Sequence, residues 1–311
     1  MITFTSVFAP QIEAMLAWRE SLGYTRSTWL YPLLNFDRFC ATRHPDQAVL
    51  TRELATQWCQ EGTRVDYPAY KAQAIRAFGE YLRLTGTDAF VLPTEWISPR
   101  SSKLPHLFTD DELTAFFTAT DRIPRSAVSP FREYTLPVLF RLILGCGLRP
   151  QEARLLRRNA VDVESAILTI ERSKRNKDRR VPVGEDLLGL LDRFDQLAEI
   201  RAPGREYFFE QRPGEPYPGR WVWASYQRCL VLAGNIAPGS SPYALRHNYA
   251  TRTLTKWVEQ GRDLRVWLPY LTAFMGHDTY AATAYYIHLL PERLAATGLT
   301  SAAGIIPEVT T

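Results

Sequence analysis

Lysine is scarce in this chain, whose 311 residues hold 5 lysines against 32 arginines. No apolar run approaches the roughly 20 residues of a membrane span, and the N-terminus lacks the charged and then apolar pattern of a secretion signal. The four cysteines are scattered without paired metal-ligand spacing, and no glycine-rich phosphate loop is present. These absences argue against a membrane protein, a zinc module and a P-loop enzyme, and they predict a protein of the reducing cytoplasm.

Charge is distributed unevenly along the chain. The formal net charge is only +4, so a broadly basic surface is not expected. Residues 1–100 hold 10 basic and 10 acidic side chains, whereas residues 101–311 hold 27 basic and 23 acidic ones. Six of the nine residues 172–180 are basic, and Lys174 and Lys177 both lie in this segment. Such a run is more often a solvated hairpin than a site, but a single basic face is enough to follow DNA phosphates.

The N-terminal part has the apolar spacing of helices. The pattern predicts helices over 11–22, 27–40 and 70–84, and a further helix that begins at Thr51. Most of the aromatic residues on these helices are expected to form the core of a four-helix bundle. Prolines and serines interrupt the periodicity after residue 92 and predict an interdomain linker.

The C-terminal part mixes helices with a few strands. A capping box at Thr109 opens a helix, and an apolar helix over 134–146 is expected to stop at Gly147. Strands are predicted over 166–171 and 180–183, with the basic segment as their turn. Ser241 is the predicted cap of the next helix. An apolar helix over 267–275 is expected to end at Gly276, with Thr279 or Asp278 capping the helix that follows.

Five short stretches, in a fixed order, carry side chains that can hold and attack one phosphodiester. They contain Arg149 with Glu152, Lys174 with Arg179, Arg246 with His247, Gly276 with His277, and Tyr286 before His288. Arginine offers a planar fork of donors for phosphate oxygens, tyrosine can act as a covalent nucleophile, and lysine can protonate a departing alkoxide. The ordered set, more than any one stretch, points to phosphodiester chemistry without a metal or nucleotide.

This set resembles the tyrosine recombinases, or phage integrases, over nearly the whole chain. That family has a Gly-Leu-Arg-x-x-Glu stretch, a lysine in a basic hairpin ending in Arg-x-Val-Pro, a His-x-x-Arg-His stretch, a Gly-His pair and a tyrosine nine residues after that histidine. The matching positions here are Arg149 and Glu152, Lys174 with Arg179, Val181 and Pro182, Arg246 and His247, Gly276 and His277, and Tyr286. One position departs, because Tyr243 stands where the family usually has histidine.

The resemblance implies a mainly α fold with a small β-sheet (α+β) and two domains. A helical, SAM-like core-DNA-binding domain (1–92) would be joined by a linker (93–107) to a tyrosine recombinase catalytic domain (108–311). The implied activity is site-specific DNA cleavage and rejoining through a 3′-phosphotyrosyl link, on behalf of a mobile element and with no metal or other cofactor. The implied partners are double-stranded DNA recombination sites, three further copies of the chain in a homotetramer, and accessory recombination proteins, in the cytoplasm at the nucleoid and without a membrane.

The resemblance also assigns roles to residues. The predicted catalytic residues are Arg149, Lys174, Tyr243, Arg246, His277 and Tyr286. Both arginines would neutralise the scissile phosphate, with His277 and Tyr243 as further donors, while Tyr286 attacks and Lys174 protonates the leaving 5′ oxygen. Glu152 is expected to orient an arginine, Lys177 is the second candidate for the lysine role, and His247 is predicted to be structural and to point away from the site.

Predicted phosphate contacts outside the reacting centre are Arg26, Arg43, Arg64, Lys71, Arg76, Arg175 and Arg179. An unperturbed phenol titrates near pH 10, so a tyrosine at position 243 can donate a hydrogen bond but can scarcely act as a base.

Taken singly, each motif has an ordinary interpretation. Arg149 could pair with Glu152 on the surface, His277 could be a helix cap, and Tyr286 could be a core residue. Three other functions therefore stay open at this point: a topoisomerase IB-like relaxase, a DNA-binding regulator with attenuated catalysis, and a helical scaffold unrelated to DNA.

Overall fold

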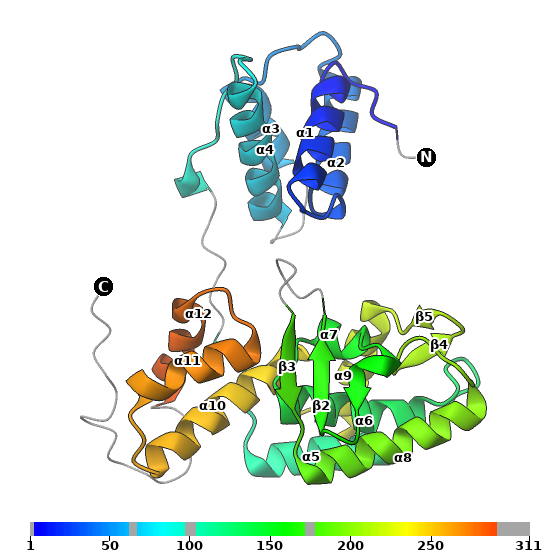
Figure 1. The fold of residues 1–311 in the computed structure, drawn as a ribbon. Coiled ribbons are helices and arrows are strands. Elements are labelled where there is room, and N and C mark those ends of the chain that lie inside the picture. Colours follow the sequence, from blue (N-terminus) through cyan, green and yellow to red (C-terminus); the bar gives the residue numbers. More distant parts are fainter. Residues whose placement is uncertain (1–2, 62–66, 97–103, 172–177, 291–311) are drawn as a thin grey trace. The chain divides into compact units, whose positions relative to one another are not determined.

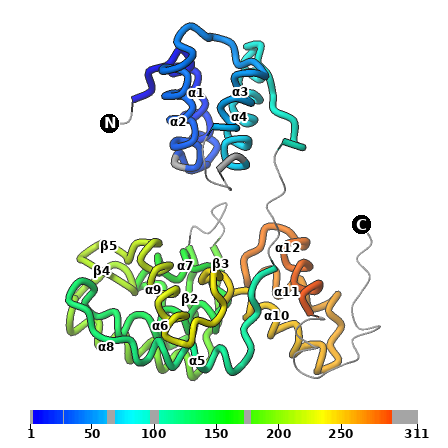
Figure 2. The backbone as a smooth tube through the Cα atoms, turned by 180° about the vertical axis from the view of Figure 1, so that it is seen from behind, coloured from blue at the N-terminus to red at the C-terminus, as the bar shows by residue number. Residues whose placement is uncertain are grey.

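The computed structural model describes residues 3–61, 67–96, 104–171 and 178–290. The chain divides into two compact units, the N-terminal unit Met1–Lys103 and the C-terminal unit Leu104–Thr311 (Figures 1 and 2). The mainly helical fold with small sheets confirms the predicted fold class. Within the described ranges, no helix is both long and apolar enough to cross a membrane.

Four helices form the N-terminal unit: α1 (Ala9–Ser21), α2 (Ser27–Arg43), α3 (Arg52–Gln60) and α4 (Tyr67–Leu84), followed by the short 3₁₀ helix η1 (Thr94–Trp96). The Thr51 hydroxyl accepts from the backbone N–H of Leu54 and caps α3, as the sequence predicts. Helix α4 packs against the other three helices. Their apolar faces meet in a core that includes Phe8, Phe36, Trp58 and Phe78, which confirms the predicted bundle.

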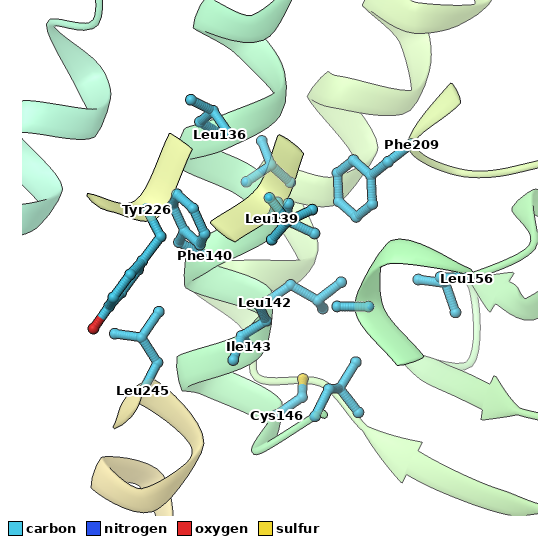
Figure 3. Packing of buried hydrophobic residues seen from close by; sticks show 14 of the residues in the cluster. Leu136, Leu139, Phe140, Leu142, Ile143, Cys146, Leu156, Phe209, Tyr226 and Leu245 are labelled. Atoms are coloured by element: carbon cyan, nitrogen blue, oxygen red, sulfur yellow. The ribbon is translucent and has the colours of Figure 1, made fainter. Parts of the chain in front are cut away.

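Helix α6 (Arg132–Cys146) is the centre of the C-terminal unit. It packs against α5 (Asp110–Asp121), α8 (Glu185–Arg201) and α10 (Tyr243–Glu259), and its buried side chains are part of the main core, to which the neighbouring elements also contribute (Figure 3). The capping box at Thr109 opens α5 as predicted. Gly147 ends α6 with a φ of 58°, a left-handed conformation that suits glycine.

A three-stranded antiparallel sheet lies beside this core. Strand β1 (Val161–Asp162) pairs with β2 (Ile167–Ile170), which pairs with β3 (Arg179–Pro182) so that Ile170 faces Arg179. The two predicted strands are confirmed. Strand β1 was not predicted, because a strand of two residues is too short to show an alternating pattern in the sequence. A second hairpin pairs β4 (Glu210–Arg212) with β5 (Glu215–Pro216).

The remaining elements place the residues of the candidate site. They are α7 (Pro150–Arg154), η2 (Arg158–Ala160), α9 (Gly219–Leu232), α11 (Leu264–Met275), α12 (Tyr280–Ala284) and η3 (Tyr285–Leu289). Gly276 ends α11 and the Thr279 hydroxyl caps α12, as predicted. Ser241 is not the cap of α10: Pro242 precedes the first helical residue, and no side chain caps this end.

Helix α11 also begins earlier than predicted. The Asp263 carboxylate accepts from the backbone N–H of Arg265 and caps the helix. The first helical residue, Leu264, lies three residues before the apolar stretch that begins at Trp267. All four cysteines are free and buried, and burial raises the pKa of each thiol. They are therefore inert core residues.

Candidate active site

Glu152 lies among three arginines that come from three different elements. Its carboxylate accepts from Arg149 Nη1 at 2.6 Å and from the Arg149 backbone N–H at 2.9 Å. Both terminal nitrogens of Arg179 donate to it, at 2.9 and 2.7 Å, and Arg246 Nη1 lies 4.0 Å away. Arg149 immediately precedes α7, Arg179 begins β3 and Arg246 lies on α10, so one carboxylate connects all three.

The C-terminal end of α11 provides acceptors for the same three arginines. The backbone carbonyls of residues 274, 275 and 276 accept, in this order, from Arg179 Nε (2.9 Å), Arg246 Nη2 (2.7 Å) and Arg149 Nη2. Arg246 Nη1 also donates to the Gly147 carbonyl. The last carbonyls of a helix have no partner within the helix, and that end of the helix attracts cations. Each guanidinium is therefore fixed in orientation before any substrate binds.

Burial makes the charges of this cluster act strongly on one another. Burial alone would raise the pKa of Glu152, but the hydrogen bonds and charges of Arg179 and Arg149 outweigh it and lower that pKa to about 2. Arg246 is only 2% exposed, and burial together with the charge of Arg149 lowers its pKa to about 10. Three cations face one anion at neutral pH. The surplus of positive charge suits a phosphate.

The hydroxyl of Tyr286 belongs to the same site. Tyr286 lies on η3 and is 3% exposed, and its hydroxyl oxygen is 2.9 Å from Nδ1 of His247. Burial raises the pKa of Tyr286, while the charge of Arg246 and its hydrogen bonding act in the opposite direction. The predicted nucleophile therefore lies next to the second predicted arginine.

His277 follows α11 and packs beside Tyr286. The two rings are nearly parallel, with centroids 6.0 Å apart. Nδ1 of His277 is 2.7 Å from the Thr283 hydroxyl, which in turn is 2.9 Å from the Thr272 hydroxyl. Burial first, and then the charges of Arg246 and other arginines, lower the pKa of His277 to about 4. The imidazole is therefore neutral at pH 7, and Thr283 fixes which edge of the ring it presents.

Tyr243 lies at the edge of the site. It is the first residue of α10 and is 43% exposed, and its ring centroid is 6.4 Å from that of His247 one turn later. The shared helix face predicted for Tyr243 and Arg246 holds only in part, because Arg246 is turned inward and buried while Tyr243 faces outward.

Two predictions about supporting residues need correction. His247 does not point away from the site, because the turn geometry of α10 brings it to the Tyr286 hydroxyl. Arg179 is not positioned as a surface phosphate contact: it is mostly buried, and all three of its side-chain nitrogens are bonded to Glu152 or to the Phe274 carbonyl. Lys174, Arg175 and Lys177 lie outside the described residues.

The N-terminal candidates are mostly paired within their own unit. Arg26 forms ion pairs with two glutamates, Arg43 with Glu61, and Arg76 with Glu80. The arginines keep part of their surface open to solvent.

Lys71 differs from these arginines, because its ammonium group is buried. It is 2% exposed, and Nζ donates to the carbonyls of Trp58 and Glu61 at 2.9 and 2.7 Å. Burial lowers its pKa. Lys71 connects α4 to the end of α3 and is not placed to contact DNA, which corrects that prediction. Arg64 lies outside the described residues.

Thr283 and Thr272 are site residues that the sequence analysis missed. Both hydroxyls are recognisable only once α11 and α12 are packed together, since threonine on a helix is common and carries no motif. Among the described residues, no group of three or more histidine, cysteine or acidic side chains is arranged to hold a metal ion.

Comparison with known proteins decides the family. A model of the phage integrase family matches residues 107–293. The chain belongs to the phage integrase family. The family match and the tyrosine recombinase relatives confirm the predicted activity, that of a tyrosine-type site-specific recombinase.

Relatives of this phage integrase family member span most of its length. The putative integrase/recombinase y4rE of Sinorhizobium fredii is 28% identical over 294 residues, which cover 92% of this chain and 93% of the relative. Tyrosine recombinase XerD of Pseudomonas putida is 31% identical over 229 residues, covering 71% of this chain and 70% of the relative.

Solved structures show the same fold. The XerH site-specific recombinase bound to a palindromic difH substrate, in a post-cleavage complex, has a TM-score of 0.64 at 18% identity, covering 88% of this chain and 78% of that one. The Tn1549 transposon integrase in complex with a circular intermediate DNA has a TM-score of 0.63 at 16% identity, covering 92% and 95%.

Proposed function

We propose that this recombinase cleaves DNA at a specific site by attack of Tyr286 on a phosphodiester held by Arg149 and Arg246. The observation that carries the proposal is the position of the Tyr286 hydroxyl, which is buried beside Arg246 and bonded to His247. A tyrosine with only a packing role does not need a buried hydroxyl next to a guanidinium.

The arginines would act by neutralising charge on the phosphate as it develops in the transition state. Their orientation is fixed by Glu152 and by the end of α11, so the substrate does not need to reorganise them. His277, neutral and oriented by Thr283, would donate a hydrogen bond from Nε2 to a non-bridging oxygen. Tyr243, exposed at the edge, would donate another. Removing one such donor typically costs about 100- to 1000-fold in rate.

The remaining chemistry rests on the family resemblance. Lys174 would protonate the leaving 5′ oxygen, with Lys177 as the second candidate, and Arg175 would contact the backbone phosphates nearby. The phosphotyrosyl link conserves the energy of the broken bond, so a 5′ hydroxyl from a second DNA can reverse the step without a nucleotide cofactor.

The DNA partner and the cellular setting are also proposals. Recombination sites in duplex DNA would be bound by the C-terminal unit together with Arg26, Arg43 and Arg76 of the N-terminal unit. Four copies would assemble on paired sites with accessory proteins, in the cytoplasm and on behalf of a mobile element. The Tn1549 transposon integrase, whose fold is similar, supports that last setting.

Covalent trapping tests the proposal. The protein is incubated with nicked duplexes that tile the DNA flanking its own gene, and protein–DNA adducts are resolved on a denaturing gel. We expect an adduct with the wild type and with Tyr285→Phe, which removes the exposed neighbouring hydroxyl, and none with Tyr286→Phe. The Tyr286→Phe protein should still bind DNA, since phosphate contacts elsewhere hold the duplex.

Other outcomes would redirect the assignment. Salt-dependent binding by the wild type without any adduct would favour a regulatory DNA-binding protein. Adducts at unrelated sequences, with relaxation of supercoiled DNA, would favour a topoisomerase-like activity. An adduct that survives Tyr286→Phe would remove Tyr286 from the mechanism.

A further inference from the structure

The proton of the Tyr286 hydroxyl has one acceptor among the described residues. Nδ1 of His247 lies 2.9 Å from the hydroxyl oxygen, within the range in which a base can take a proton from a nucleophile. The two rings are 5.6 Å apart between centroids and tilted by 51°. His247 reaches Tyr286 from α10, and in the part of the chain that the structure describes no other ring nitrogen is bonded to this oxygen.

The direction of that hydrogen bond follows from the other neighbours. Arginine has donors only, so Arg246 can only donate toward the Tyr286 oxygen. A phenol has a single proton, which must then point to an acceptor. Within the described part of the chain that acceptor is Nδ1 of His247, so Nε2 carries the imidazole proton in the resting state.

The second histidine of the site is arranged differently. Nδ1 of His277 is bonded to the Thr283 hydroxyl, and its ring lies nearly parallel to that of Tyr286 instead of meeting the hydroxyl edge-on. Tyr243 lies one turn before His247, and the centroids of the two rings are 6.4 Å apart. The two histidines of the site therefore have separate tasks.

We propose that His247 is the general base of the reaction, taking the proton of Tyr286 in strand cleavage and returning it in strand rejoining. This inference rests on the proposed function, since it concerns the same tyrosine. Because His247 directly follows Arg246, one turn of α10 presents both the cation that binds the phosphate and the base that activates the nucleophile.

Bonds and protons balance in each direction. In cleavage, the Tyr286 oxygen forms a bond to phosphorus, the bond from phosphorus to the 5′ oxygen breaks, and the phenol proton moves to Nδ1 to give an imidazolium. The 5′ oxygen receives its proton from a separate acid, the role proposed for Lys174. In rejoining, the oxygen of a 5′ hydroxyl forms a bond to phosphorus and gives its proton to the conjugate base of that acid. The bond from phosphorus to the Tyr286 oxygen breaks, and the imidazolium returns its proton to the departing phenolate.

The charges around His247 make this base depend on substrate. Burial and then the charge of Arg246 lower the pKa of His247 to about 4, so Nδ1 carries no proton at neutral pH. A phosphodiester anion bound to Arg246 offsets the guanidinium charge and makes the imidazole more basic. The other titratable groups close to His247 are Tyr243, His277 and Tyr286 itself. Tyr286 would therefore be activated only when DNA is in place.

The test replaces His247 with asparagine, whose amide occupies the place of Nδ1 and keeps a hydrogen bond but cannot take a proton. We expect His247→Asn to slow single-turnover adduct formation on a nicked duplex by about 100- to 10,000-fold, with unchanged DNA binding. His288→Asn is the matched control, because His288 lies on η3 together with Tyr286 but its side chain is exposed. It should react at the wild-type rate.

A second arm separates proton transfer from positioning. When Tyr286 is replaced by a fluorinated tyrosine that ionises near neutral pH, the defect of His247→Asn should shrink at least tenfold, because the nucleophile then needs no base. Wild-type rates for His247→Asn, or an equal defect with both tyrosines, would overturn the inference while the Tyr286-dependent adduct of the wild type still upheld the function. Absence of any wild-type adduct would overturn both.

Discussion

Replacing Glu152 with glutamine removes only one charge, but it should strongly destabilise the C-terminal unit. The carboxylate is mostly buried and carries hydrogen bonds from Arg149 and Arg179. Its pKa is about 2 instead of 4.5, and at about 1.4 kcal/mol per pH unit the difference corresponds to about 3 kcal/mol at neutral pH. The same change removes the negative charge that Arg149, Arg179 and Arg246 share.

Differential scanning calorimetry of the full chain measures this effect. For a unit of about 200 residues each kcal/mol changes Tm by about 2–4 °C, so Glu152→Gln should lower the transition of the C-terminal unit by about 6–12 °C. Glu164→Gln is the control, because Glu164 is exposed in the turn between β1 and β2 and should leave Tm nearly unchanged. Combining Glu152→Gln with Arg179→Met should cost less than the sum of the two single changes.

The pH dependence gives the result that would refute the reasoning. A carboxylate whose pKa is lowered by folding stabilises the protein fully above about pH 4.5, and this contribution is lost as the pH falls toward 2. The stability difference between wild type and Glu152→Gln should therefore narrow across that window. A difference below about 1 kcal/mol at pH 7, or additive effects with Arg179→Met, would mean that the ion pairs do not act as described.

Two further predictions concern the residues around His277 and Tyr243. Tyr243→Phe should slow adduct formation by removing a donor to the phosphate, and Tyr243→His should at least preserve the rate, since histidine can donate too; an unchanged rate for Tyr243→Phe would show that the hydroxyl has no part. Thr283→Val should reduce single-turnover cleavage tenfold or more with little change in DNA affinity, because His277 loses the partner that orients its ring. A wild-type rate for Thr283→Val would exclude Thr283 as a positioning residue.

The features of the fold that could be predicted from the sequence are those determined by residues close together in the chain. The capping box at Thr109 and the stops at Gly147 and Gly276 depend on residues within one turn of each other, and the structure has all three. The four N-terminal helices follow from apolar spacing. The cap predicted at Ser241 was wrong because the chain had a second way to begin that helix, at Pro242.

The parts that sequence missed depend on contacts between distant elements. A motif places His247 after Arg246, but only the packing of η3 against α10 brings Tyr286 to its Nδ1. Lys71 looked like a surface cation because the sequence shows its charge but not its partners, which include two backbone carbonyls. Arg179 was expected to contact DNA for the same reason. In the structure it is bonded to Glu152, a contact that the sequence does not reveal.

The carbonyls at the end of α11 have a consequence for how this sequence can vary. Arg179 and Arg246 are bonded to the backbone oxygens of residues 274 and 275, so the side chains at these two positions do not orient the arginines. These side chains are constrained only by packing, as in the stacking of Phe274 on Tyr249. Gly276 is the exception: its φ is 64°, and a Cβ there would lie 2.9 Å from Arg179 Nη1. Residues 274 and 275 can therefore be substituted without disturbing the cluster of Glu152 and its three arginines, provided that Gly276 is kept.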